Sequence, residues 1–249
     1  MRFKDKVAFI TGGGRGIGET YARALSAEGA AVVLAEIDMP AAEGVAASIA
    51  DRGGRALAVA CDVADESSVD TAVARAVEHF GGIDILINNA GRGYDAPVEL
   101  IDIKPFRYIY DLNIIGPIVA MQQVIPIMKK QGGGAIINIS SGTALMDLPG
   151  MSPYSSSKKA LAGISLAARQ ELEGAGIVVS VAYPYITLTE FEKNTIRAVP
   201  VPGKEIEPTG PFPSDSAEFV AERIVEGILT GEAEIFSHEW QKARRTQGE

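Results

Sequence analysis

Residues that commonly cross-link or ligate are scarce in this sequence, which has one cysteine and two histidines among 249 residues. Because Cys61 is the only cysteine, no disulfide can form within the chain, which fits a reducing compartment. His79 and His238 are too few and too far apart in sequence to indicate a metal site. We therefore expect neither a disulfide framework nor a bound metal.

Long apolar runs and an excess of positive charge are also missing. No apolar stretch approaches the ~20 residues that a membrane-spanning helix needs. The charged start, residues 1–6, and the four apolar residues after it do not have the pattern of a secretory signal. The formal net charge is −9, from 23 Lys and Arg against 32 Asp and Glu, which argues against nucleic-acid binding. We expect a soluble cytoplasmic protein with no nucleic acid and no membrane among its partners.

What the chain does contain is a regular alternation of short apolar runs and longer amphipathic ones. The apolar runs predict strands at residues 7–10, 31–35, 56–60, 83–87, 135–139, 177–182 and 233–236. The amphipathic runs predict helices at 16–28, 38–51, 65–79, 105–130, 152–173 and 215–229. This order predicts an α/β fold with one parallel sheet covered by helices on both faces. Residues 1–249 are expected to form a single domain, with a substrate loop at about 185–213 whose proline-rich part, 199–213, acts as a lid.

A glycine-rich loop, TGGGRGIG at residues 11–18, follows the first expected strand and opens the first expected helix. A dinucleotide pyrophosphate needs a close backbone approach and a helix N-terminus directed at it. Gly12, Gly16 and Gly18 meet these needs, and Arg15 and Ile17 lie among them. An ordinary tight turn is the alternative, but the strand before the loop and the helix after it favour dinucleotide binding.

Glu36 ends the second expected strand, 18 residues after Gly18. A carboxylate there can accept hydrogen bonds from the adenosine ribose and repels a 2′-phosphate, which predicts NAD rather than NADP. Arg15 is the counter-evidence, because a guanidinium can bind that phosphate. Asp38 is a second carboxylate nearby, and we interpret it as a helix cap.

Further polar residues follow the third and fourth expected strands, at the edge of the sheet where ligands of open α/β folds bind. Asp62, next to Val63, is placed to reach the adenine amino group. Asn89, Ala90 and Gly91 come after the fourth strand, where turn chemistry is the alternative role for the asparagine. We count all five among the cofactor-binding residues.

With these motifs the chain resembles the classical short-chain dehydrogenase/reductase family. The resemblance rests on the glycine loop, Asp62, residues 88–91, Asn113, Ser141, Tyr154-x-x-x-Lys158, and Pro184 with Thr189. It implies a doubly wound Rossmann domain with a seven-stranded sheet, a nicotinamide cofactor bound also by Tyr154, Lys158, Pro184 and Thr189, and a catalytic tetrad of Asn113, Ser141, Tyr154 and Lys158. It also implies a homodimer or homotetramer, with helices 105–130 and 152–173 at the subunit interface.

The chemistry of the tetrad can be argued from the residues themselves. Tyr154 and Lys158 are four apart and share a helix face, whereas Lys159 turns away from it. A nearby ammonium and an oxidised nicotinamide both favour the phenolate, and lowering the pKa of a tyrosine from about 10 to about 7 takes ~4 kcal/mol. Ser141 can donate to the substrate oxygen, while strand alternation turns Ser140 the other way. Asn113 either holds a water near the lysine or satisfies backbone groups at a helix irregularity.

Two segments depart from the family pattern. Tyr185 follows Pro184 where the family usually has glycine, and its ring is expected near the nicotinamide or the substrate. The segment 234–240 lacks the usual glycine-rich ending, and Trp240 with the basic residues after it is interpreted as a solvated tail or subunit contact.

The function predicted from the sequence is NAD-dependent interconversion of a secondary alcohol and a ketone, with Tyr154 as general acid and base. Apolar residues that follow Ser141 and the sixth strand predict a hydrophobic, alicyclic or aromatic substrate; they are Leu145, Met146, Leu148, Tyr185 and Phe191. The alternatives are an NAD-binding sensor or scaffold subunit without turnover, and a dehydratase or epimerase on the same fold.

Overall fold

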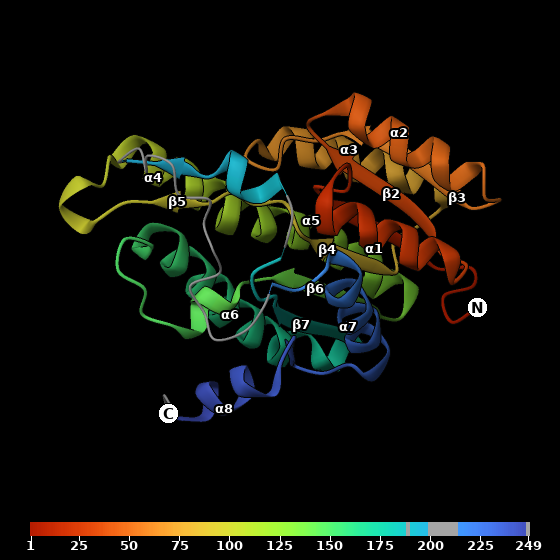
Figure 1. Ribbon diagram of the computed structural model, residues 1–249. Helices are drawn as coiled ribbons and strands as arrows, with labels where there is room; N and C mark the ends of the chain where they lie inside the picture. The colour runs from red at the N-terminus through yellow and green to blue at the C-terminus, as the bar shows by residue number, and fades with distance from the viewer. Residues whose placement is uncertain (188–189, 199–213, 248–249) are drawn as a thin grey trace.

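A seven-stranded parallel sheet forms the centre of the molecule in the computed structural model, which describes residues 1–187, 190–198 and 214–247 (Figure 1). The strand order is β3-β2-β1-β4-β6-β7-β9, and every neighbouring pair is parallel. The strands are β1 (Val7–Thr11), β2 (Ala31–Glu36), β3 (Arg55–Ala60), β4 (Ile85–Asn88), β6 (Gly134–Ile139), β7 (Ile177–Tyr183) and β9 (Glu234–Phe236). The predicted sheet is thereby confirmed.

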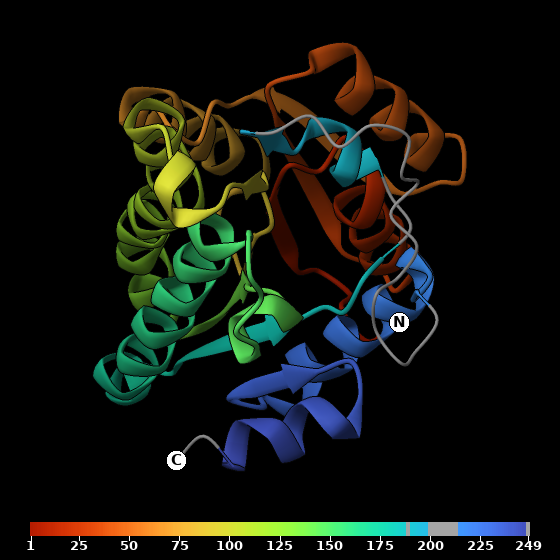
Figure 2. The same ribbon diagram turned by 60° about the vertical axis from the view of Figure 1, so that its left-hand side comes forward.

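Helices cover both faces of this sheet because alternate strand residues point to opposite sides. Phe9 packs in one core with α3 (Glu66–Phe80), α5 (Gly116–Gln131) and the end of α6 (Ser152–Leu172). Its neighbour Ile10 packs in a second core with α1 (Gly16–Ala27), α2 (Met39–Ala50) and α7 (Ala217–Thr230). Figure 2 shows the two helical layers on either side of the strands. The predicted doubly wound α/β class is confirmed.

The order of the strands reverses between β1 and β4, which lie side by side at the middle of the sheet. The chain runs outward from β1 through β2 to β3, and outward from β4 through β6 and β7 to β9. At such a reversal the loops after the two central strands diverge and leave room for a ligand. The glycine loop follows β1 and residues 89–91 follow β4, so both motifs lie at this point.

The long helix predicted at 105–130 is interrupted before its glycine-proline pair. Helix α4 (Ile103–Tyr110) passes into a π-helical turn, Asp111–Ile115, and then into α5. By length and composition alone the whole stretch, Ile103–Gln131, is apolar enough to cross a membrane, but 56% of its most apolar window is buried in this structure. It is packed here as a core helix, where apolar residues face the sheet rather than lipid.

Besides short 3-10 turns, two strands and one α-helix among the described residues were not predicted. The short strands β5 (Tyr94–Asp95) and β8 (Ile196–Arg197) pair in parallel to form a separate two-stranded sheet. The third element is helix α8 (Glu239–Gln247), which follows β9 at the end of the chain. It contains Trp240 and the basic residues that were interpreted as a solvated tail or subunit contact, and between them lies Gln241, which is completely buried.

The predicted lid at 199–213 and the predicted cofactor residue Thr189 lie outside the described residues.

Candidate active site

The glycine loop is held in a conformation that side chains would block. Gly12 and Gly16 adopt positive φ angles of 66° and 55°, a region that costs other residues free energy. A Cβ at Gly18 would lie 2.0 Å from the Gly12 carbonyl oxygen, so α1 approaches the loop more closely than any other residue would permit. Arg15, the N-cap residue, does not cap the first amides of α1 with its side chain. The loop therefore fits an anionic ligand at the helix N-terminus.

Carboxylates gather beside this loop at the end of β2. Glu36 accepts hydrogen bonds from the amides of Gly14 at 3.1 Å, Ile37 at 2.9 Å and Asp38 at 3.2 Å. Asp38 caps α2 by accepting from the amide of Ala41, as predicted, and also forms an ion pair with Arg15. The guanidinium that would favour a 2′-phosphate is thus partly neutralised by a neighbouring carboxylate.

Asn89 braces the glycine loop from the neighbouring strand end. Its Nδ2 donates to the carbonyl oxygens of Thr11 and Gly12, both at 3.0 Å. The backbone amides of Asn89 and Ala90 donate to the Thr11 hydroxyl at 3.0 and 3.1 Å. The two loops after β1 and β4 are therefore joined into one surface, and a structural role for Asn89 is present in the chain alone.

The two remaining predicted adenine-end residues lie in the turn after β3. The Asp62 carboxylate accepts from the Ala64 amide at 3.0 Å, which orders that turn. The backbone of Val63 lies so close to α5 that a Cβ at Gly116 would be 2.6 Å from the Val63 carbonyl oxygen. Contact of either residue with a cofactor stays a prediction.

Tyr154 and Lys158 lie on one face of α6 and are both buried, with 8% and 3% of their surfaces exposed. The Lys158 Nζ donates to the Ile139 carbonyl oxygen at 2.8 Å and lies 5.9 Å from the centre of the Tyr154 ring. Lys159 instead points outward and forms an ion pair with Asp147 at 2.8 Å. The i,i+4 spacing thus places Lys158, and not Lys159, beside the Tyr154 ring.

Ser141, rather than Ser140, faces Tyr154. The Ser141 hydroxyl lies near the Tyr154 phenol, where it makes a hydrogen-bond contribution that lowers the pKa of Tyr154, and it accepts from the amide of Thr143 at 3.2 Å. The Ser140 hydroxyl points the other way and donates to the Lys158 carbonyl oxygen at 2.9 Å. Strand alternation persists through the end of β6, which is why the two serines separate.

Asn113 reaches the same place through the π-helical turn. Its Nδ2 donates to the Ser157 hydroxyl at 3.0 Å and to the Arg92 carbonyl oxygen at 3.1 Å, and its Oδ1 accepts from the Arg92 amide at 3.0 Å. Gly91 lies between Asn113 and Lys158, because a Cβ there would be 3.1 Å from Oδ1 and 3.2 Å from Nζ. All four residues of the predicted tetrad therefore converge, with Gly91 closing the gap between two of them.

Burial dominates the protonation of the site. Desolvation raises the pKa of Tyr154 to about 12; the Ser141 hydrogen bond opposes this, and the Glu192 and Asp95 carboxylates add to it. Desolvation also lowers the pKa of Lys158 to about 8. A lowered pKa was expected for Tyr154 from the sequence, and in the chain alone its pKa is raised instead. The physical reason is that a phenolate buried among carboxylates loses more hydration than one lysine over its ring restores.

Two groups near Tyr154 come from the small β5–β8 sheet and the turn before it. The ring of Phe191, one of the predicted apolar residues, lies 5.6 Å from the Tyr154 ring. Asp95 and Glu192 approach closely enough to affect the tyrosine, and Arg197 pairs with Glu192 at 2.7 Å and with Asp95 at 3.8 Å. Sequence reasoning missed both carboxylates, although Asp95 follows β4 at the same edge of the sheet as the predicted residues.

Tyr185 does not adopt the strained backbone that its replacement of glycine suggested. Among the described residues, Asp5 is the one non-glycine residue with a positive φ. The Tyr185 ring is buried against His238 and Trp240, and the Pro184 carbonyl accepts from the Gly142 amide at 2.8 Å. The loop after β7 is therefore joined to the turn that carries Ser141.

Comparison with known proteins agrees with this geometry. Residues 6–199 match the family model for the short chain dehydrogenase. The chain is 32% identical to cyclohexanol dehydrogenase from Acinetobacter sp. (strain SE19), covering 92% of this chain and 96% of that protein. It is 40% identical to galactitol 2-dehydrogenase from Agrobacterium fabrum (strain C58 / ATCC 33970), covering 74% and 71%.

A solved structure is similar over nearly the whole chain. The 3-ketoacyl-(acyl-carrier-protein) reductase from Brucella melitensis, complexed with NADH, superposes with a TM-score of 0.85 at 30% identity, covering 94% of this chain and 97% of that one. Together with the family match and the converging tetrad, this shows that the chain belongs to the short chain dehydrogenase family of oxidoreductases.

Proposed function

We propose that this protein is an NAD-dependent oxidoreductase that interconverts a secondary alcohol and a ketone, with Tyr154 exchanging the proton. The observation that carries the proposal is the convergence of Tyr154, Ser141, Lys158 and Asn113 beside the glycine loop. A sensor subunit without turnover would not need this arrangement, and all four side chains are present in it.

The chain's own residues fit a nicotinamide dinucleotide. The uncapped start of α1 and the close approach at Gly18 suit the pyrophosphate, and Glu36 suits the adenosine ribose. Glu36 and Asp38 together disfavour a 2′-phosphate, which supports NAD over NADP. NAD, when bound, supplies the hydride for ketone reduction and accepts it in alcohol oxidation.

The proton is exchanged by the buried hydroxyl groups. Tyr154 donates a proton to the carbonyl oxygen in reduction and removes one from the alcohol in oxidation. The Ser141 hydroxyl, which lies near the same phenol, holds the substrate oxygen in reach of it. Lys158 lies over the tyrosine ring, where its ammonium favours the phenolate, and Asn113 connects this end of the site to the Arg92 backbone.

The surroundings of Tyr154 favour a neutral, apolar substrate. The Phe191 ring supplies an apolar wall, while Asp95 and Glu192 disfavour an anionic group beside the tyrosine. A cyclic alcohol of the kind named for the cyclohexanol dehydrogenase relative meets both conditions. The alternative is a polyol, as named for the galactitol 2-dehydrogenase relative, because the Asp95 and Glu192 carboxylates can accept hydrogen bonds from its hydroxyl groups.

The test of this function is the substitution Tyr154→Phe, assayed with a panel of cyclic and acyclic alcohols and ketones by NADH absorbance. Turnover should fall by at least a thousandfold, because the substrate oxygen loses its proton partner, while the Kd for NADH changes less than threefold. Tyr21→Phe is the matched control, since the Tyr21 hydroxyl is buried and has no hydrogen-bond partner among the described residues. Near-normal kcat in Tyr154→Phe would contradict the proton role, and absence of turnover by wild type would favour a binding subunit.

We also propose that the protein is a cytoplasmic homo-oligomer, a dimer or tetramer. Apolar side chains around α4 and the start of α5 are exposed, including Val98 at 73%, Ile103 at 56% and Ile115 at 50%. Exposed apolar side chains of this kind favour association with a second copy. Light scattering of the purified protein measures the assembly, and a monomer at micromolar concentration would contradict it.

A further inference from the structure

A short segment after β7 lies along the loop that follows β4. It consists of a 3-10 turn, Glu190–Asn194, and of β8, which pairs in parallel with β5 (Figure 1). The amide of Ile196 donates to the Gly93 carbonyl oxygen at 2.9 Å, and the amide of Ala198 donates to the Asp95 carbonyl oxygen at 3.0 Å. Backbone hydrogen bonds therefore hold the segment in place without help from its charged side chains.

The paired segments also lie against α6, the helix that carries Tyr154. The amide of Ala96, next to β5, donates at 2.7 Å to the carbonyl oxygen of Gly150, just before α6, and β5 itself packs on this helix. From the other segment, the ring of Phe191 lies 5.6 Å from the ring of Tyr154. Side chains of β5 and of the 3-10 turn are thus brought beside the phenol from two distant parts of the chain.

Three charged side chains of these segments form one ion-pair group. The Arg197 guanidinium lies 2.7 Å from the Glu192 carboxylate and 3.8 Å from the Asp95 carboxylate. Both carboxylates add to the effect of burial in raising the pKa of Tyr154. Burial also raises the pKa of Asp95 to about 6, and Glu192 adds to this rise while Arg197 opposes it. At higher pH the group therefore carries two negative charges and one positive charge.

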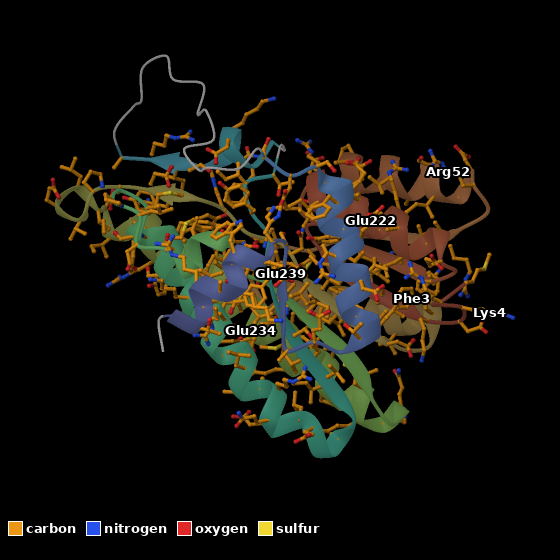
Figure 3. All side chains as sticks on the ribbon, turned by 60° about the horizontal axis from the view of Figure 1, so that its bottom comes forward. Phe3, Lys4, Arg52, Glu222, Glu234 and Glu239 are labelled. Atoms are coloured by element: carbon orange, nitrogen blue, oxygen red, sulfur yellow. The ribbon has the colours of Figure 1, made fainter. Side chains whose placement is uncertain are left out.

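Other charged groups near the phenol make different contacts. Lys158 lies 5.9 Å from the centre of its ring and donates to a carbonyl oxygen of β6. Arg92 donates to the carbonyl oxygen at the end of the 3-10 turn, and Lys193 is exposed on that turn. The charges of α8 are remote, because this helix, whose start is labelled Glu239 in Figure 3, lies apart from the segment in all three views. Among the described residues, Arg197 is therefore the cation that pairs with both carboxylates.

We propose that Arg197 is a positioning residue of the oxidoreductase, which holds the Glu192 and Asp95 carboxylates in an ion-pair group beside Tyr154 and offsets their charge at the phenol. The proposal rests on the proposed alcohol–ketone activity and deepens it. Alcohol oxidation needs the phenolate as base, and negative charge nearby disfavours that form. The group carries one net negative charge with Arg197 and two without it. Arg197 therefore extends alcohol oxidation to lower pH.

The activity test follows kcat/KM against pH at saturating NAD⁺, for the alcohol that wild type oxidises fastest. The value should rise with pH as Tyr154 loses its proton, and the midpoint of this rise is the measured quantity. Arg197→Gln should raise the midpoint by about half a pH unit or more, because two carboxylates are then uncompensated. Glu192→Gln should lower it, because Arg197 then faces a single carboxylate. The double variant restores one net negative charge, so its midpoint should return close to that of wild type.

Two further variants separate the effect of charge from that of packing. Arg197→Lys keeps the positive charge and should keep the wild-type midpoint, even where kcat is lower. Lys159→Gln removes the cation of an exposed ion pair on α6 and should leave the midpoint unchanged. If Arg197 served only the packing of the segment, Arg197→Gln would instead lower kcat/KM by the same factor at every pH.

A titration without turnover measures the phenol directly. Tyrosine labelled with ¹³C at Cζ should give seven NMR signals, one for each tyrosine of the chain, and Tyr154→Phe identifies the signal of Tyr154. With NAD⁺ added, this signal should titrate at higher pH in Arg197→Gln than in wild type, and at lower pH in Glu192→Gln. The order of these midpoints should match the order of the kinetic ones.

The outcomes separate the two proposals. If wild type oxidises an alcohol but Arg197→Gln and Glu192→Gln both keep its midpoint, the role of Arg197 is overturned and the alcohol–ketone activity stands. If wild type converts no alcohol or ketone, the proposed function fails, and the NMR titration still decides whether Arg197 offsets the carboxylates at Tyr154. An NMR midpoint that moves in neither variant overturns that role as well.

Discussion

Replacing Lys158 should abolish activity and yet leave the folded protein as stable as wild type or more stable. The residue is buried, with 3% of its surface exposed, and burial lowers its pKa from 10.5 to about 8. This difference corresponds to about 3 kcal/mol of destabilisation at neutral pH. Lys158→Met removes the charge and retains most of the volume, but leaves the Ile139 carbonyl without its donor at a cost of about 1–3 kcal/mol. The variant should be inactive and, at pH 7, equal to wild type or up to about 2 kcal/mol more stable.

The pH dependence provides the sharper measurement. Between pH 8 and 10.5 the unfolded chain keeps a proton on Lys158 that the folded chain has released, so wild-type stability rises with pH in this window. From pH 7 to 9.5 wild type should gain about 2 kcal/mol relative to Lys158→Met in urea unfolding. Lys159→Met is the control, because the Lys159 side chain is 47% exposed, and it should show no such gain. A Lys158→Met variant that is several kcal/mol less stable at pH 7, with a difference independent of pH, would refute the reasoning.

Three further results are expected. Asp95→Asn should raise the free energy of unfolding at pH 7.5 by about 1–2 kcal/mol, because burial raises the Asp95 pKa to about 6 and makes the carboxylate costly to ionise at higher pH. In urea unfolding, this gain over wild type should shrink as the pH falls from 6 to 4. A gain that does not change with pH would contradict this origin. Gly18→Ala should weaken NADH binding at least tenfold, measured by calorimetry, and should lower the Tm, because the new Cβ would lie 2.0 Å from the Gly12 carbonyl oxygen. Unchanged binding would show that the close approach of α1 to the glycine loop is not needed. Wild type should have a kcat/KM with NAD⁺ at least tenfold higher than with NADP⁺, and Glu36→Ala should reduce this preference. If wild type uses NADP⁺ as well as NAD⁺, the role of Glu36 is overturned.

The sequence by itself determined those features that depend on neighbours along the chain. The positions of the strands and helices along the chain follow from alternating apolar and amphipathic runs. The cap at Asp38 follows from local hydrogen bonding, and the shared face of Tyr154 and Lys158 follows from helix periodicity. The choice of Ser141 over Ser140 follows from the two-residue repeat of a strand. Each of these is set within a few residues, so spacing is enough to predict it.

Only the tertiary structure decided what depends on distant segments. The pKa of Tyr154 is set by burial and by Asp95 and Glu192, which reach it from other parts of the chain. The ring of Tyr185 packs against Trp240, which lies more than fifty residues later in the chain. Helix propensity and local pattern carry no information on such contacts, because desolvation and packing depend on the whole fold. The shared face of Tyr154 and Lys158 was therefore predictable from spacing, and the tetrad was implied by the family resemblance, while the protonation of Tyr154 and the side chains around it required the three-dimensional arrangement.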